Sequence, residues 1–308
     1  MEIIQDKYYE LQKFYDWAVS VSDPRVKDWP LMQSYTPTIV LTIIYIFSVI
    51  IGKRIMADRE PIKFKYTLFF YNLGLIALNF HIASTLFISA YRAGYSLQCQ
   101  SVKYSYDPNE YSIASALWWF YISKLVEMLD TIFFVLRKKN NQISFLHVYH
   151  HASMFPLWFI GVKWVAGGQS FFGAMINSFI HVLMYSYYGL SALGPHMQKY
   201  LWWKRYLTIL QLLQFFIGMV YGFQSLYLGC DFPLWMQYTG LVYGVTIITL
   251  FCNFYIQAYM KKPKAHSQKP VKEATANGEI NGKVTENSKK SKNGSSVSNG
   301  HMEKKKDK

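Results

Sequence analysis

The chain alternates between long apolar runs and short polar segments. Each apolar run holds about 20 residues, the length that a helix needs to cross the hydrocarbon core of a bilayer. We therefore predict an all-α, polytopic membrane protein with seven transmembrane helices. The predicted spans are residues 35–51, 66–91, 113–136, 145–165, 171–190, 207–228 and 234–259.

The polar segments between these runs differ in charge. Residues 52–65, 137–139 and 199–205 are rich in Lys and Arg, and such loops tend to stay on the cytoplasmic side of a membrane. With seven spans all of them fall on one side, which predicts a lumenal N-terminus and a cytoplasmic C-terminus. Residues 1–34 are mixed and polar, and we expect them to form a short surface segment with aromatic anchors at the interface.

Composition changes sharply after residue 264. The whole chain of 308 residues is 52% hydrophobic and carries a net charge of +14, but residues 261–308 hold thirteen Lys against five Asp or Glu and almost nothing apolar. We predict a membrane domain over 1–264 and a disordered, basic cytoplasmic tail over 265–308. Lys305 and Lys306 resemble a dilysine retrieval signal of the endoplasmic reticulum, with a merely solvated lysine-rich end as the alternative. No nucleic-acid-binding module is visible, so no nucleic-acid partner is expected.

Three histidines stand at the start of the fourth predicted span. His147, His150 and His151 are spaced i, i+3 and i+4, so they share one face of a helix. Imidazoles at membrane depth are costly to desolvate, and such a cluster favours a functional site over a set of core histidines satisfied by their neighbours.

Three further sets of polar residues lie inside predicted spans at helical spacing. A structural ion pair is the alternative for the first set, packing for the second, and interhelical hydrogen bonds for the third. The sets are Lys124, Glu127, Asp130 and Thr131; Asn177, His181, Tyr185, Tyr187 and Tyr188; and Thr208, Gln211 and Gln214. Asn79 and His81 in the second span are expected to be packing residues.

The three cysteines are expected to lie in different environments. Cys99 and Cys230 fall in loops that this topology places in the oxidising lumen, which predicts a disulfide between them, with two free thiols as the alternative. Cys252 falls within the seventh span and is expected in the core.

The polar sets, in their order and spacing, resemble the four signatures of the very-long-chain fatty acid elongases, the condensing enzymes of the endoplasmic reticulum. The signatures are Lys124–Thr131, His147–His151, Asn177–Tyr188 and Thr208–Gln214. The resemblance covers about residues 25–262. It implies condensation of an acyl-CoA with malonyl-CoA, with loss of CO2, to give a 3-ketoacyl-CoA.

The resemblance also implies the surroundings of the reaction. The expected partners are the two CoA substrates, membrane lipid, and the ketoreductase, dehydratase and enoyl reductase of the elongation cycle; homo- or hetero-oligomers remain open. No cofactor and no metal are expected. The acyl chain would lie in a tunnel enclosed by the helices.

A condensation of this kind needs a nucleophile, and no thiol lies near the histidines. A neutral imidazole is nucleophilic, so we expect His150 to attack the acyl-CoA, with His151 or His181 as base or orienting group. Asn177, His147 and His181 are expected to stabilise the oxyanions, and the carboxylates to orient the histidines. The remaining catalytic candidates are Lys124, Glu127 and Asp130. The expected substrate-binding residues include Tyr185, Tyr187, Tyr188, Gln211 and Gln214. Basic residues are expected to bind CoA, with plain topology determination as the alternative: Arg137, Lys138, Lys139, Lys204 and Arg205.

Two other classes of protein remain open. His-x-x-His-His also occurs in membrane di-iron desaturases and hydroxylases, but these need several such boxes, and three of the eight histidines here lie in a loop or the tail. A seven-span receptor or transporter would fit the topology, but it needs neither clustered histidines nor a retrieval signal.

Overall fold

The computed structural model describes residues 2–260, and every regular element in that range is helical. The predicted tail, its dilysine ending and the cytoplasmic C-terminus lie outside the described residues. The elements are α1 (Glu2–Ser20), α2 (Thr36–Ile55), α3 (Lys65–Arg92), α4 (Pro108–Glu127), α5 (Leu129–Leu136), η1 (Asn140–Gln142), α6 (Phe145–Val165), α7 (Ser170–Ala192), η2 (Pro195–Tyr200), α8 (Lys204–Tyr227), α9 (Leu234–Tyr255) and η3 (Ile256–Met260).

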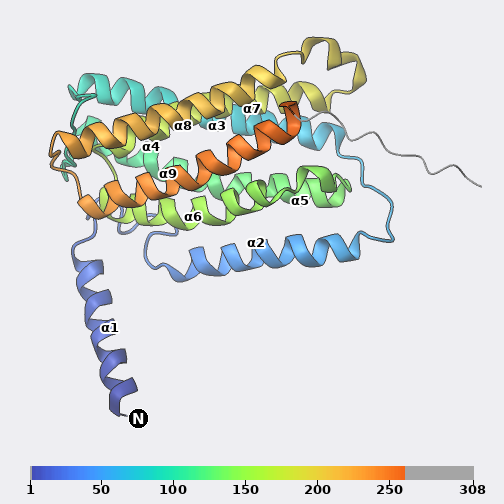
Figure 1. Ribbon diagram of the computed structural model, residues 1–308. Helices are drawn as coiled ribbons and strands as arrows, with labels where there is room; N and C mark the ends of the chain where they lie inside the picture. The colour runs from blue at the N-terminus through green and yellow to red at the C-terminus, as the bar shows by residue number, and fades with distance from the viewer. Residues whose placement is uncertain (1, 261–308) are drawn as a thin grey trace, which may run out of the picture. The chain divides into compact units, whose positions relative to one another are not determined.

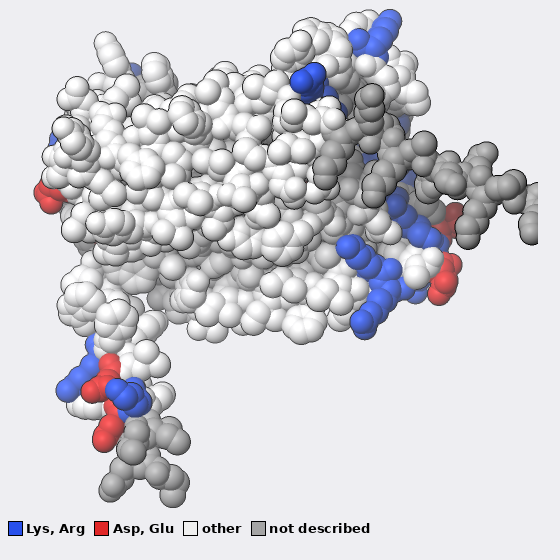
Figure 2. All heavy atoms as spheres, in the orientation of Figure 1, with Lys and Arg blue, Asp and Glu red and all other residues white. Residues whose placement is uncertain are grey.

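Helices α2 to α9 run side by side as a bundle (Figure 1), in which α3 packs on α4 and α7, α6 packs on α2, α4 and α9, and α8 packs on α7 and α9. Aromatic side chains fill the space between α4 and α6: Tyr121 stacks on Phe155 with ring centroids 4.7 Å apart. Side chains that point out of the bundle are largely apolar, including Ile44 and Phe47 of α2 and Phe216 of α8. The face of the molecule in Figure 2 is almost free of charge along the bundle, with Lys and Arg gathered near the end of α2, whereas α1 carries both acidic and basic residues. Such a surface suits lipid rather than water.

All seven predicted spans contain helix, but within residues 2–260 four helical segments are long and apolar enough to cross a membrane: 36–55, 65–92, 204–227 and 234–260. The other three predicted spans carry the charged and polar residues of the site, which make them less apolar. The span predicted over 113–136 is also divided into α4 and α5. The chain turns tightly there, since the amide of Met128 donates to the carbonyl of Leu125 and that of Thr131 donates to the carbonyl of Met128.

Most of the N-terminal segment is the 19-residue helix α1, which is not among the predicted elements. The segment that follows α1 is held by a buried ion pair, in which Arg25 Nη2 lies 2.6 Å from Asp23 Oδ2. The same guanidinium donates to the carbonyls of Glu110, at the start of α4, and of Ala166, at the end of α6. Residues 21–34 are thus fastened to the bundle rather than lying free on its surface.

Two of the three cysteines form a disulfide, and the third is free. Cys99, in the segment after α3, forms a disulfide with Cys230, in the segment before α9, with Cα atoms 5.3 Å apart. Cys252 is exposed, so its predicted place in the core is wrong. An apolar helix at the edge of a bundle presents one face to lipid, and hydrophobicity alone does not distinguish that face from the buried one.

Candidate active site

The three histidines of α6 lie in a row that reaches α5 and α2. Helix α6 begins after Ser144, whose hydroxyl accepts a hydrogen bond from the amide of His147 at 3.2 Å. The ring of His151 lies 4.5 Å from that of His147 and 5.2 Å from that of His150, measured between centroids. His147 Nε2 lies 2.9 Å from the hydroxyl of Thr131, which in turn lies 2.8 Å from the hydroxyl of Tyr45. A hydroxyl between these two partners fixes the position of the first ring.

A second set of polar groups joins α4 to α7. Lys124 Nζ lies 2.9 Å from Glu127 Oε1, and the same oxygen lies 3.1 Å from His181 Nδ1. Lys124 also donates to Asn177 Oδ1 at 3.3 Å. Lys124 and Glu127 are 1% and 0% exposed, so each charge depends on the other for its compensation. The carboxylate holds the imidazole of His181 by one ring nitrogen and leaves the other nitrogen available.

Asp130 does not contact a histidine. Its Oδ2 accepts a hydrogen bond of 2.9 Å from the hydroxyl of Tyr185, which is fully buried. Tyr187 packs edge-on against Trp203 of the segment before α8, with centroids 5.2 Å apart, and Tyr188 is 37% exposed. Of the three predicted tyrosines, only Tyr185 therefore contacts Asp130, whereas Tyr187 contacts Trp203 and Tyr188 is partly exposed.

Helices α6 to α9, together with Phe120 of α4, line a partly open cavity of about 490 Å³, the inner cavity. His150, Asn177 and Gln214 line one part of it, and Asn177 Nδ2 lies 3.5 Å from Gln214 Oε1. Most of the rest of the lining is apolar, and the cavity reaches Gln169 and Gln237 beside the disulfide. A histidine and two amides at one end of a largely apolar cavity can hold a long hydrocarbon with a carbonyl group next to the imidazole.

The structure adds residues that sequence reasoning missed. Tyr243 of α9 lines the inner cavity, and its hydroxyl lies 2.9 Å from that of Ser153, one turn after His150. No pattern in the sequence marks this pair, because the two residues lie on different helices. Five glycines also line the cavity, and their repetition in α8 and α9 is the one available signal. They are Gly173, Gly218, Gly222, Gly240 and Gly244.

Other predicted residues lie away from the inner cavity. Gln211 Nε2 contacts Met184 Sδ at 3.4 Å, and Thr208 lies beside Tyr259. Lys138 donates to the carbonyls of Ala57 and Arg59, whereas Arg205 contacts the hydroxyl of Tyr255. Arg137 is half-buried, and Lys139 and Lys204 are exposed. Among residues 2–260, no three His, Cys, Asp or Glu side chains are placed so that they could share a metal ion.

Comparison with known proteins bears on these signatures. Residues 30–267 match the model of the ELO family, described as the GNS1/SUR4 family. Four further segments predict that the type-four elongases are near relatives: Trp29–Ser34, Cys99–Val102, Lys163–Gln169 and Gln198–Arg205. This prediction is confirmed, since the chain is 52% identical to "Very long chain fatty acid elongase 4" of Homo sapiens over 299 residues, which is 96% of this chain and 95% of the relative.

Relatives of other types are also similar. "Very long chain fatty acid elongase 2" of Mus musculus is 48% identical over 265 residues, covering 85% of this chain and 90% of the relative. "Very long chain fatty acid elongase 5" of Tachysurus fulvidraco is 43% identical over 284 residues, covering 92% and 95%. With the family model matching most of its length, this chain belongs to the ELO (GNS1/SUR4) family.

Proposed function

We propose that this chain is the condensing enzyme of fatty acid elongation. It joins a long or very-long-chain acyl-CoA to malonyl-CoA and releases CO2, CoA and a 3-ketoacyl-CoA. The observation that carries the proposal is the inner cavity, in which His150, Asn177 and Gln214 meet at one end of an apolar space. The names of the relatives, very long chain fatty acid elongases, support the substrate class.

The reaction divides into two steps. A ring nitrogen of neutral His150 attacks the thioester carbonyl, the C–S bond breaks, and the CoA thiolate takes the proton that the imidazole loses. The product is an acyl-imidazole. Malonyl-CoA then loses CO2, and the carbon of its enolate attacks the acyl carbon. Cleavage of the C–N bond releases an imidazolate, which takes a proton that comes from the solvent and becomes neutral His150 again.

The neighbouring groups support both steps. Asn177 lines the cavity with His150, so its amide is available to the oxyanion that forms on the carbonyl oxygen. Glu127 holds Nδ1 of His181, and Thr131 holds Nε2 of His147, so these rings act as orienting or proton-transferring groups. Lys124 forms an ion pair with Glu127 that is buried in an apolar setting.

The proposal includes the membrane setting. All seven predicted spans cross the bilayer of the endoplasmic reticulum, with the N-terminus in the lumen and the C-terminus in the cytoplasm. CoA approaches from the cytosol past Arg137, Lys139, Lys204 and Arg205, while Lys138 serves chiefly to hold the segment after α2. The 3-ketoacyl product passes to a ketoreductase, a dehydratase and an enoyl reductase.

A trapping experiment tests the nucleophile. Full-length protein in membranes is incubated with acyl-labelled acyl-CoA without malonyl-CoA, denatured, and analysed for covalent label. Wild type should carry one labelled histidine, and His150→Ala should lose both the label and malonyl-CoA-dependent extension. His81→Ala is the matched control, since His81 lies in a long apolar helix away from the site and is exposed. Undiminished label in His150→Ala rules the mechanism out.

A further inference from the structure

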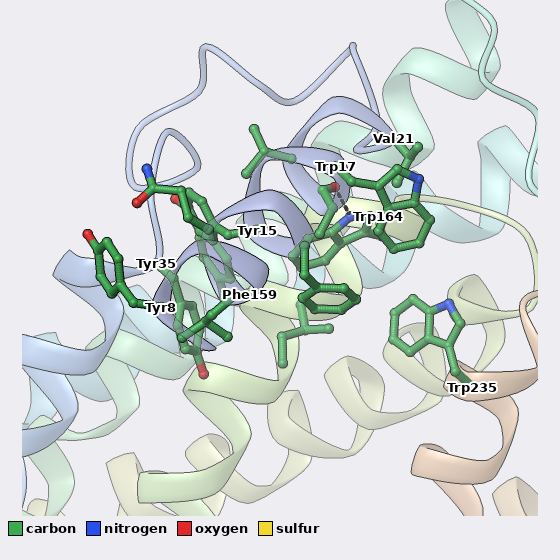
Figure 3. Close-up of a pocket in the computed structure, with 14 residues that line it drawn as sticks. Tyr8, Tyr15, Trp17, Val21, Tyr35, Phe159, Trp164 and Trp235 are labelled. Atoms are coloured by element: carbon green, nitrogen blue, oxygen red, sulfur yellow. Dashed lines mark hydrogen bonds between the residues drawn. The ribbon is translucent and has the colours of Figure 1, made fainter. Parts of the chain in front are cut away.

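A second apolar cavity lies between α1 and the bundle. Its volume is about 970 Å³, and thirteen of its fourteen lining residues are apolar or aromatic, Gln12 being the exception. Figure 3 shows the aromatic side chains of α1 around this space together with Tyr35, Phe159, Trp164 and Trp235. We call it the outer groove. A space with this lining suits an apolar occupant such as a hydrocarbon chain.

The outer groove and the inner cavity share part of their lining. Ile160 of α6 and Trp235 of α9 line both. The two spaces are therefore next to each other, at the end of the inner cavity that lies farthest along α6 from His150. Trp235 is 45% exposed, so its ring is not locked by close packing on all sides.

The inner cavity is short for the proposed substrates. Gln214 and Ser225 of α8 both line it, and eleven residues of helix span about 16 Å. A bilayer has a hydrocarbon core of about 30 Å, so the cavity is about as long as one leaflet is deep. It therefore suits a chain of ordinary membrane-lipid length, and the remainder of a very long chain needs a further apolar space.

Helix α1 is built to supply that space. Tyr8, Leu11, Tyr15 and Ala18 recur at spacings of three and four and line the groove. The charged residues of the helix do not line it, and Leu11 and Tyr8 are 65% and 67% exposed. The end of α1 is anchored to α6, because Trp164 Nε1 donates to the carbonyl of Ala18 at 2.7 Å.

We propose that the outer groove is the binding site for the distal part of a very long acyl chain, which leaves the inner cavity between Ile160 and Trp235 and lies along α1. This inference rests on the proposed function, since it assumes that an acyl chain occupies the inner cavity. It assigns α1 a role in chain-length specificity: chains that end within the inner cavity do not need the groove, and longer chains do.

Filling the groove tests the proposal. Ala18→Trp adds bulk to the lining, and Ser20→Trp adds the same bulk on an exposed side of α1 that does not line the groove. Both variants of the full chain, in membranes, are assayed for malonyl-CoA-dependent extension of a series of saturated acyl-CoAs of increasing length. We expect Ala18→Trp to lose at least tenfold in rate for the longest chains and less than twofold for the shortest, while Ser20→Trp keeps the wild-type profile. An unchanged profile, or an equal loss at every length, overturns the proposal.

Photolabelling of the wild-type protein tests the proposed position of the acyl chain independently. Acyl-CoAs with a photoreactive diazirine at the terminal carbon, one short and one very long, are bound to wild type, irradiated and mapped by peptide mass spectrometry. The short probe should label α8 or α9, and the very long probe should label α1 or the region around Trp164. If both probes extend with malonyl-CoA but neither labels α1, the outer site is wrong and the proposed function stands. If no acyl-CoA is extended at all, the proposed function itself fails. A diazirine phospholipid tests the alternative occupants. If it labels α1 and excess very-long-chain acyl-CoA does not displace it, the groove binds membrane lipid. If α1 crosslinks to another chain, the groove binds a second copy, and either result overturns the proposal.

Discussion

Glu127 is the residue on which the electrostatics of the site depend. It is fully buried, and one of its oxygens serves both Lys124 and His181. In a low-dielectric interior neither the carboxylate nor the ammonium is tolerated alone, so this carboxylate stabilises the protein and orients the imidazole at the same time.

Glu127→Gln should therefore lower both the stability of the protein and its activity. Removing the carboxylate leaves the ammonium of Lys124 buried without compensation, at a cost of about 3–5 kcal/mol. We expect a markedly lower unfolding temperature in detergent and loss of extension activity. Glu10→Gln is the control, because Glu10 pairs with Lys7 on the exposed face of α1. Wild-type stability of Glu127→Gln would contradict the importance of this pair.

Thr131→Val tests a different contact. The substitution keeps the size of the side chain but removes the hydroxyl that lies between Tyr45 and His147, leaving buried polar groups without a partner at about 1–3 kcal/mol. We expect kcat to fall more than the affinity for acyl-CoA, since the ring of His147 loses its position. In Thr249→Val, the lost hydroxyl bonds only to the carbonyl of Val245 on an exposed face, so both quantities should be retained. Equal effects of the two substitutions would argue against a positioning role.

The sequence predicts which residues belong to the site better than it predicts the contacts between their side chains. The spacing of Lys124 and Glu127 on one helix predicts their pairing, because both lie on one face. It does not predict that Asp130 binds Tyr185 or that Lys138 binds backbone carbonyls, since these contacts depend on how separate helices are rotated against each other. The catalytic roles of these residues stay predictions.

Glycines of α8 and α9 line the inner cavity. Gly218 lines the inner cavity and has no atom within 4 Å of where a Cβ would lie, so any side chain there projects into open space. Gly173 and Gly240 have equally open surroundings, so they also leave room beside the cavity. Gly222 and Gly244 differ, because the space of a Cβ there is taken by the side chains of Leu241 and Met219, so these two glycines allow α8 and α9 to approach each other closely.

Gly218→Leu should therefore obstruct the acyl chain. Leu favours helix over Gly by nearly 1 kcal/mol, so folding should not suffer. We expect extension of long acyl-CoAs to fall at least tenfold. Gly74→Leu is matched, because Gly74 lies in α3, has equally open surroundings and does not line the cavity. Product profiles of the two variants give the comparison, and full activity of Gly218→Leu would show that the chain lies elsewhere.

Helix positions follow from the sequence more closely than helix limits do. The predicted span 145–165 and α6 agree at both ends, because a serine cap and the polar turn at Gly167 and Gly168 bound the apolar run. The break at Met128 has no counterpart in the prediction, since nothing in an apolar run signals a change from α-helical to tighter hydrogen bonding. Helix α1 is not among the predicted elements because charged residues interrupt its apolar positions, so it holds no apolar run of membrane length. The spacing of Tyr8, Leu11, Tyr15 and Ala18 is the sequence signal that would have indicated it.

Across the whole molecule, the disulfide joins segments 131 residues apart in sequence. It holds the segment after α3 to the segment before α9, next to the end of the inner cavity at Gln169 and Gln237. Closing so long a loop restricts the unfolded chain, which stabilises the folded protein by a few kcal/mol.

Cys99→Ser should lower the unfolding temperature by several degrees, measured by size-exclusion chromatography after heating. Under non-reducing conditions the variant should migrate like reduced wild type. Cys252→Ser removes the one free cysteine of the described residues and should change neither property. A Cys99→Ser variant as stable as wild type would mean that the bundle alone holds these segments.

The hydrogen bonds of Arg25 determine when the N-terminal segment can reach its final place during biosynthesis. Its guanidinium binds the carbonyl of Ala166, a residue translated 141 positions later. The N-terminal segment emerges first from the ribosome but cannot reach its final place until α6 has been made and inserted. It must therefore remain unassembled until more than half of the chain has been made, and this end of the bundle closes around the arginine only after that point.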